Sequence, residues 1–215
     1  MHPSISDFPS EFFYNNQLID GITQTDRPTL IGFWPNDIPT VILHNSYTEY
    51  SDIKKSVSNN DEAKEVLEVI NQMTENSVDY KKIVVITPYE AQKNIILQLI
   101  RSQGVLVDVV NVDEFQGSER DYVIFSTVRS NSENKIGFLS DYRRLNVAIT
   151  RARFGMVILG NCEVLLQSDL WRHILKFYLD RRLIFEGNFG RLRLWNCEIE
   201  LFENFDFGES FDYFS

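Results

Sequence analysis

The stretch Lys82-Ile-Val-Val-Ile-Thr87 is a continuous apolar run, rich in β-branched side chains, that Pro88 brings to an end. A strand without polar alternation is typical of a parallel sheet that helices cover on both faces. Two further runs, Thr40-Val-Ile-Leu-His44 and Gly155-Met-Val-Ile-Leu-Gly160, have the same character. These three runs predict a buried, mainly parallel sheet.

Segments with helical spacing lie between the predicted strands. From about residue 61, apolar side chains recur on one helix face, at Ala63, Val66, Leu67, Ile70 and Met73. Further helices are expected at about 4–14, around 95–100, at 141–150 and at 169–179, with additional strands at 107–112 and 122–128. The alternation of strands and helices predicts an α/β fold with three α/β/α layers.

The length of 215 residues suits a single folded domain with a real core. We expect an N-terminal helix and loop at 1–40 and the main domain at 41–195. The last segment, 196–215, is acidic and aromatic, and we expect it to be a flexible tail.

Composition excludes several classes of protein. No apolar run approaches the roughly 20 residues that cross a bilayer, and the N-terminus does not resemble a secretory signal. Cys162 and Cys197 have no metal-like spacing, which predicts reduced thiols in a cytoplasmic or nuclear protein. Six acids between Glu198 and Asp212 account for much of the net charge of −10, and removing them leaves −4. Net charge therefore gives no support to nonspecific nucleic-acid binding.

Polar side chains gather after the predicted strands, at Thr87-Pro88-Tyr89, 113–120, 127–130 and Asn161. Open parallel sheets bind ligands at the carboxyl ends of their strands. We therefore expect a binding site at that edge.

The segment Asn146-Val-Ala-Ile-Thr-Arg-Ala-Arg-Phe-Gly155 carries a candidate catalytic arginine, Arg151, near the end of a short helix. Arg144 lies seven residues earlier, which predicts that both arginines share one helix face. A positioned guanidinium stabilises the charge that develops on a γ-phosphate during transfer. The alternative is that these arginines pair with Asp141 or with surface acids.

The segment Phe115-Gln-Gly-Ser-Glu-Arg-Asp121 is a second candidate. Gly117 permits a tight approach of the backbone to a ligand, and the carboxylate of Glu119 could accept hydrogen bonds from a ribose. A plain polar turn between two strands explains the same residues equally well.

Thr87, Pro88 and Tyr89 lie where a strand meets a helix. The free amides of a helix N-terminus attract phosphate, and an aromatic ring there could stack on a base. The alternative, which spacing alone favours, is ordinary capping: Thr87 caps the helix, Pro88 takes its first turn and Tyr89 packs. His2, His44 and His173 are scattered, so we expect no metal site.

In order and spacing these segments resemble the second RecA-like domain of superfamily 1B helicases. Residues 112–129 look like motif V and its extension, and residues 143–153 look like motif VI. Ile86-Thr-Pro-Tyr-Glu-Ala-Gln92 resembles the Thr-Pro-Tyr segment of that superfamily. Met1-His-Pro3 is similar to the end of its Gln-Tyr-Arg-Met-His-Pro motif. Phe8-Pro-Ser-Glu-Phe-Phe-Tyr14 and Leu170-Trp-Arg-His-Ile-Leu-Lys-Phe-Tyr178 favour the up-frameshift RNA helicases of nonsense-mediated mRNA decay, although the senataxin-like and immunoglobulin-mu-binding helicases share both motifs.

The resemblance implies a RecA-like fold, hydrolysis of ATP with Mg²⁺, and a role for each matching residue. Arg151 would be the arginine finger, and Glu119 would bind the ribose beside Gly117. The remaining matches comprise the RNA groove, with Thr87, Pro88, Tyr89, Thr127 and Arg129, and the supporting motif VI positions, with Arg144, Asn146, Thr150 and Arg153.

The 215 residues contain no Gly-Lys-Ser/Thr phosphate loop. They also lack the motif in which helicases of this superfamily hold Mg²⁺ with an Asp-Glu pair. By resemblance, a first RecA-like domain would supply both. The family's adenine-stacking tyrosine and the first of its two γ-phosphate arginines would lie just before Met1. The sequence is compatible with Met1 as an internal methionine of a longer protein and with Met1 as the start of a reduced or split gene.

Two hypotheses follow for the function. The first is the C-terminal motor domain of an ATP-dependent RNA helicase, inactive without the first RecA-like domain. Its partners would be RNA, that domain and decay factors, in the cytoplasm or nucleus and away from membranes. The second is a truncated module that binds RNA or a protein without catalysis. An unrelated small nucleotide-binding enzyme would need a catalytic set that the sequence lacks.

Overall fold

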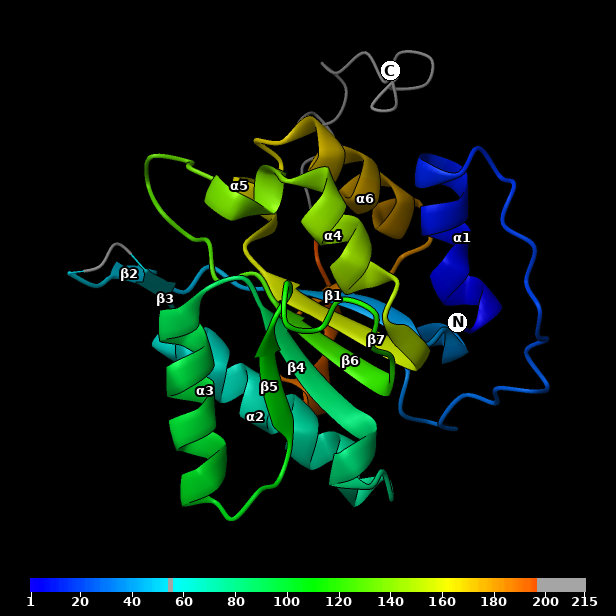
Figure 1. Ribbon diagram of the computed structural model, residues 1–215, viewed down its shortest axis with the longest axis horizontal. Coiled ribbons are helices and arrows are strands. Elements are labelled where there is room, and N and C mark those ends of the chain that lie inside the picture. Colours follow the sequence, from blue (N-terminus) through cyan, green and yellow to red (C-terminus); the bar gives the residue numbers. More distant parts are fainter. Residues whose placement is uncertain (54–55, 197–215) are drawn as a thin grey trace.

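The computed structural model describes residues 1–53 and 56–196, and a seven-stranded sheet with the order β5-β4-β6-β7-β1-β8-β9 forms its centre (Figure 1). The four central strands are β4 (Ile83–Thr87), β6 (Arg120–Ser126), β7 (Ala152–Gly160) and β1 (Thr40–His44). All of them run parallel to their neighbours. The predicted parallel sheet is therefore confirmed.

Shorter strands complete the sheet on both sides. β5 (Asp108–Asn111) pairs in parallel with β4, and β8 (Ile184–Glu186) pairs in parallel with β1. β9 (Arg193–Leu194) pairs antiparallel with β8 and makes the sheet mixed at that edge.

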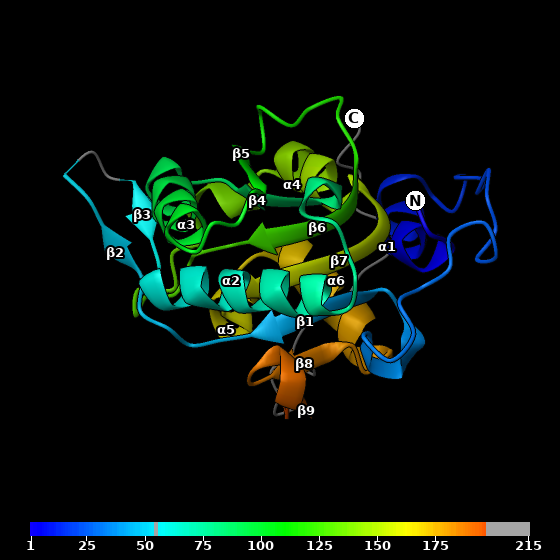
Figure 2. The ribbon, with the colours of Figure 1, turned by 90° about the horizontal axis from the view of Figure 1, so that it is seen from below.

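Helices cover both faces of the sheet, which gives the predicted three layers (Figures 1 and 2). One face carries α2 (Asn60–Glu75) and α3 (Glu90–Ser102). The opposite face carries the remaining helices: α1 (Pro3–Phe13), α4 (Tyr142–Ile149), α5 (Cys162–Leu165) and α6 (Asp169–Asp180).

Strand β4 shows why the sheet has two cores. Val84 and Ile86 pack with the face that includes α4 and α6, whereas Ile83 and Val85 pack with the face that includes α2 and α3. All four side chains are fully buried, because successive side chains of a strand point to opposite faces. Two-sided burial explains the continuous apolar run from which the fold was predicted.

Several short elements were not predicted. The segment between β1 and α2 contains a small antiparallel pair, β2 (Tyr50–Ser51) and β3 (Val57–Ser58), which forms a narrow arm in Figure 1. α5, β8 and β9 were also missed, because two to four residues are too few to show a period. The structure also has 3₁₀ segments at Pro35–Asp37, Tyr80–Lys82, Gly137–Ser140 and Phe189–Arg191.

The acidic tail predicted at 196–215 lies outside the described residues, except for Asn196. Among the described helices, none combines the length and apolarity needed to cross a bilayer.

Trp171 anchors α6 to the sheet and provides a test of the fold. Its side chain is fully buried, stacks on Phe125 with 6.4 Å between ring centroids, and donates from Nε1 to the carbonyl of Leu139 at 2.9 Å. We expect Trp171→Ala to lower the free energy of unfolding by about 3–5 kcal/mol, because it leaves a large cavity. Lys176→Ala on the same helix removes only a surface ion pair with Asp180 and should cost less than about 1 kcal/mol. Chemical denaturation of both variants checks this, and equal losses would contradict it.

Candidate functional site

The predicted site residues lie at opposite ends of strands β6 and β7. Gly117 and Glu119 precede β6 and Arg151 precedes β7, which places them at the amino edge of the sheet. The segments after β4 and β6 lie at the carboxyl edge. With seven residues in β6, the two edges are about 20 Å apart. The expectation that all of 113–120 lies at the carboxyl edge is wrong for 117–119, because this segment crosses back to begin a parallel strand.

Arg151 lies beyond the helix on which it was predicted. α4 ends at Ile149 and Thr150 is its C-cap, so a helix face shared by Arg151 and Arg144 is ruled out. The Nε of Arg151 donates to the carbonyl of Val147 at 2.9 Å. Its own carbonyl accepts from the amide of Arg120 at 3.1 Å, which ties Arg151 to the turn that carries Gly117 and Glu119.

The arginines of this segment differ in their acidic partners. Arg144 makes a two-pronged contact with Asp113, from Nε at 3.1 Å and from Nη2 at 3.0 Å. Arg153 pairs with Asp121. In the part of the chain that the structure describes, no carboxylate lies within ion-pair distance of Arg151. The alternative that Arg144 and Arg151 pair with acids therefore holds for Arg144, through Asp113, and not for Arg151. Asp141 accepts from backbone amides at the start of α4.

Two other residues of the segment that resembles motif VI, Asn146 and Thr150, form hydrogen bonds at the end of α4. The hydroxyl of Thr150 donates to the carbonyl of Asn146 at 2.6 Å. The side-chain amide of Asn146 donates to the hydroxyl of Tyr14 at 3.3 Å, which links α4 to the N-terminal segment. These contacts fix the point at which the chain leaves the helix toward Arg151.

Gly117 and Glu119 lie at the amino edge of the sheet with open space around them. Gly117 has a φ of +80°, in the left-handed region that favours glycine. A Cβ built there would meet nothing within 4 Å, so conformation rather than crowding accounts for the glycine. Glu119 is exposed and forms no hydrogen bond within the described residues, so its carboxylate is accessible.

At the carboxyl edge, Thr87 and Thr127 are fully buried, and their hydroxyl oxygens have no hydrogen-bond partner among the described residues. α3 begins at Glu90 with Tyr89 as its N-cap residue. The expectations that Thr87 caps this helix and that Pro88 takes its first turn are therefore wrong, because the helix begins only at Glu90.

Tyr89 packs, as the capping alternative expected. Its ring is 4% exposed and lies edge-on to Phe138, with 5.9 Å between centroids. The guanidinium carbon of Arg129 lies 6.0 Å from the same ring. Burial raises the pKa of the Tyr89 hydroxyl. Pro88 and Arg144 line a neighbouring cavity of about 140 Å³.

Glu49 holds the loop that contains Arg129, a role that was not predicted. Its Oε2 lies 3.1 Å from the Nε of Arg129, and both side chains are about 10% exposed. The same oxygen accepts from the amide of Ser130 at 2.6 Å and from the side chain of Asn131 at 3.0 Å.

Glu62 is the second residue that sequence reasoning missed. It is fully buried on α2, and its Oε1 accepts from the Ser126 hydroxyl at 2.6 Å and from the Val128 amide at 2.9 Å. Burial raises its pKa to about 7, although these hydrogen bonds oppose the shift. The sequence feature that could have revealed Glu62 is its place on the apolar stripe of the predicted helix, one turn before Val66.

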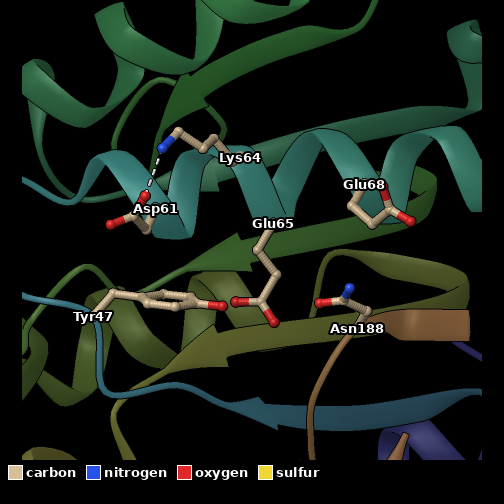
Figure 3. Close-up of a pocket in the computed structure, with 6 residues that line it drawn as sticks. All are labelled: Tyr47, Asp61, Lys64, Glu65, Glu68 and Asn188. Carbon is tan, nitrogen blue, oxygen red and sulfur yellow. Dashed lines mark hydrogen bonds and ion pairs between the residues drawn. The ribbon is translucent and has the colours of Figure 1, made fainter. Parts of the chain in front are cut away.

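A cavity of about 250 Å³ opens beside α2, away from Arg151 (Figure 3). Glu65 extends into it toward Tyr47 and Asn188. Burial, followed by the charge of Glu62, raises the pKa of Glu65 to about 8. Across residues 1–53 and 56–196, no three His, Cys, Asp or Glu side chains are grouped to hold a metal ion.

Comparisons with known proteins identify relatives. A family model described as an AAA domain matches residues 1–163. The regulator of nonsense transcripts 1 homolog of Drosophila melanogaster is 40% identical over 203 residues, which cover 90% of this chain and 17% of that protein. The ATP-dependent helicase NAM7 of Saccharomyces cerevisiae is 40% identical over 212 residues, which cover 94% of this chain and 22% of that protein.

Among solved structures, the C-terminal domain of a possible DNA helicase from Lactobacillus plantarum WCFS1 is similar, with a TM-score of 0.42 and 18% identity. The match covers 74% of this chain and 84% of that one. The chain spans between 15% and 23% of the length of the curated relatives that it matches. The chain therefore belongs to the AAA domain family, and it matches a segment of the regulators of nonsense transcripts.

Proposed function

We propose that this chain is the C-terminal motor domain of an ATP-dependent RNA helicase, in which Arg151 is the arginine finger. The observation that carries the proposal is the state of Arg151. Its Nε is anchored on Val147, whereas no acidic side chain of the described residues neutralises its charge. An arginine that is positioned and not paired can stabilise the charge that develops on a transferred phosphoryl group.

The neighbouring turn supplies the rest of this half-site. Glu119 would accept hydrogen bonds from the ribose of ATP, and Gly117 would let the backbone approach the nucleotide. The hydrogen bond between Arg120 and Arg151 keeps the turn beside the finger. The phosphates and Mg²⁺ would be held mainly by a partner RecA-like domain with a phosphate loop, a motif that these 215 residues do not contain.

The carboxyl edge would form part of the RNA groove, through Thr87, Pro88, Tyr89, Thr127 and Arg129. Because the hydroxyls of Thr87 and Thr127 are buried, these two residues would contact RNA through their backbone groups. Arg129 is the positively charged member of the set, and phosphate contacts dominate affinity for nucleic acids.

The biological role follows from the relatives' names. They include regulators of nonsense transcripts and ATP-dependent helicases. We therefore propose a role in nonsense-mediated mRNA decay in the cytoplasm or nucleus, with RNA and decay factors as partners.

Removing the finger tests the catalytic proposal. Residues 1–196 would replace the corresponding segment of the yeast NAM7 helicase, because the isolated chain should show no ATP hydrolysis. In this chimera we expect Arg151→Ala to lower RNA-stimulated ATP turnover on the order of 10³-fold, since the transition state loses a positive charge. Arg101→Ala, at an exposed arginine near the end of α3, is the matched control and should leave turnover unchanged. Near-normal turnover in Arg151→Ala would reject the finger role, and turnover by the isolated chain would reject the half-site.

Arg129→Ala tests the RNA groove in the isolated chain. We expect weaker binding of single-stranded RNA at low salt. The slope of log affinity against log salt should fall in magnitude by about 0.7, because one phosphate contact is lost. Fluorescence anisotropy over a salt series measures both quantities, with Arg101→Ala as the control. An unchanged slope in Arg129→Ala would show that Arg129 contacts no phosphate.

A further inference from the structure

Val128 has an unusual backbone conformation, which begins the inference. Its φ is +72°, in the left-handed region that a β-branched residue rarely adopts, and its side chain is fully buried. Such strain persists only where the surroundings determine the conformation, and it is concentrated at functional sites. The neighbour of Val128 is Arg129, so this strained residue sets the direction in which Arg129 leaves the sheet.

The start of α2 holds both backbone groups of Val128. Its amide donates to Oε1 of Glu62 at 2.9 Å, and its carbonyl accepts a longer contact from the side chain of Asn59 at 3.5 Å. Asn59 is the N-cap of α2, and its Oδ1 accepts from the amide of Glu62 at 3.1 Å. The two residues that grip Val128 therefore also fix each other.

A third side chain connects this grip to α3. Gln92 donates from Nε2 to the Ser126 hydroxyl at 3.1 Å and accepts at Oε1 from the amide of Asn59 at 2.8 Å. Ser126 in turn donates to Glu62 at 2.6 Å. All four side chains are fully buried. A buried polar network whose members are hydrogen-bonded to one another specifies one conformation and penalises others.

On the far side of Val128, the loop is held from a different element. Glu49 pairs with Arg129 and accepts from the Ser130 amide. The Val128 side chain packs with Val57 and Tyr89, and a Cβ on Gly137 would approach the Arg129 guanidinium to 2.8 Å. Arg129 thus lies in a narrow slot beside Glu49 and Gly137, directly after the strained backbone of Val128.

From these contacts we infer that Glu62 is a positioning residue, which acts from α2 through the Val128 amide to aim Arg129 at the carboxyl edge. This inference deepens the proposed RNA groove and rests on it for its functional consequence. Glu62 itself touches no ligand, because it is fully buried beneath the loop.

The network also indicates which variants are informative. Glu62→Ala removes the acceptor for Val128. Glu62→Gln retains one acceptor oxygen, and its new amide would face Asn45, whose Oδ1 is buried and has no partner. If the side-chain amide of Asn45 turns over, it can accept from the introduced glutamine. Glu62→Gln should therefore preserve the grip on Val128.

The experiment compares these variants with Ile70→Val, which removes a methyl group from a fully buried side chain on the same helix, outside the network. Hydrogen exchange would be followed at the Val128 amide in the 215-residue chain. In Glu62→Ala we expect exchange at least about tenfold faster than in Ile70→Val, after correction for global stability. In Glu62→Gln we expect it to stay within about threefold of the original chain. If Glu62→Ala does not fold, Glu62→Asp, which draws the carboxylate back from Val128, takes its place.

RNA affinity provides the second readout. Glu62→Ala should weaken binding of a single-stranded RNA by the same factor as Arg129→Ala. The double variant should bind RNA as tightly as either single variant, because both changes remove the same contact between Arg129 and RNA. Glu62→Gln should restore the affinity.

Three outcomes are decisive. Unchanged Val128 exchange in Glu62→Ala would overturn the inference. Faster exchange with normal RNA affinity, while Arg129→Ala binds weakly, would also overturn it, because the loop would then be held without aiming Arg129. Faster exchange while both variants bind normally would support the grip on Val128 and reject the proposed RNA role of Arg129.

Discussion

Burial of β6 and β7 on both faces is the constraint on which the rest of this structure depends. Helices cover both faces of the sheet, and the residues of these strands are buried from Asp121 to Ser126 and from Gly155 to Gly160. A charged group that is to meet a ligand must therefore lie where a strand begins or ends. The structure divides such groups between two edges, with Arg151 and Glu119 at one and Arg129 at the other. The proposed placement of nucleotide and RNA at separate sites follows from this division.

The two edges achieve order in different ways. At the amino edge, backbone hydrogen bonds suffice: the amide of Arg120 meets the carbonyl of Arg151 as part of the β6–β7 ladder. At the carboxyl edge the ladder has ended, and the loop after β6 adopts a strained conformation at Val128. Two glutamates replace the ladder there: Glu62, which is fully buried, and Glu49, whose side chain is about 10% exposed. A carboxylate suits this task because it can accept several hydrogen bonds at once.

Much of the fold could be predicted because two-sided burial leaves a strong signal, as in the apolar run that became β4. The arm formed by β2 and β3 was missed because strands of two residues have no period. The helix that bears Arg144 was also predicted, and its end at Ile149 lies within one residue of the predicted end, whereas the placement of Arg151 on its face was wrong. The hydrogen bond from Thr150 to Asn146 helps to close the last turn before Arg151. The contact between Glu62 and Val128 joins residues 66 positions apart, and a single sequence does not reveal such pairs. The position of Glu62 on the apolar stripe of the predicted helix could nevertheless be read from the sequence.

The unbroken register of β6 against β7, from Tyr122 opposite Gly155 to Ser126 opposite Leu159, has a mechanical consequence. A close-packed sheet of this kind has low compressibility and does not bend easily along its strands. Arg151 lies beside the register shift that precedes this regular segment, and Arg129 lies in the loop beyond its other end, so both arginines are attached to the same stiff sheet. In the proposed function, a change in the separation between this body and a neighbouring domain would therefore move the nucleotide edge and the RNA edge by one and the same displacement.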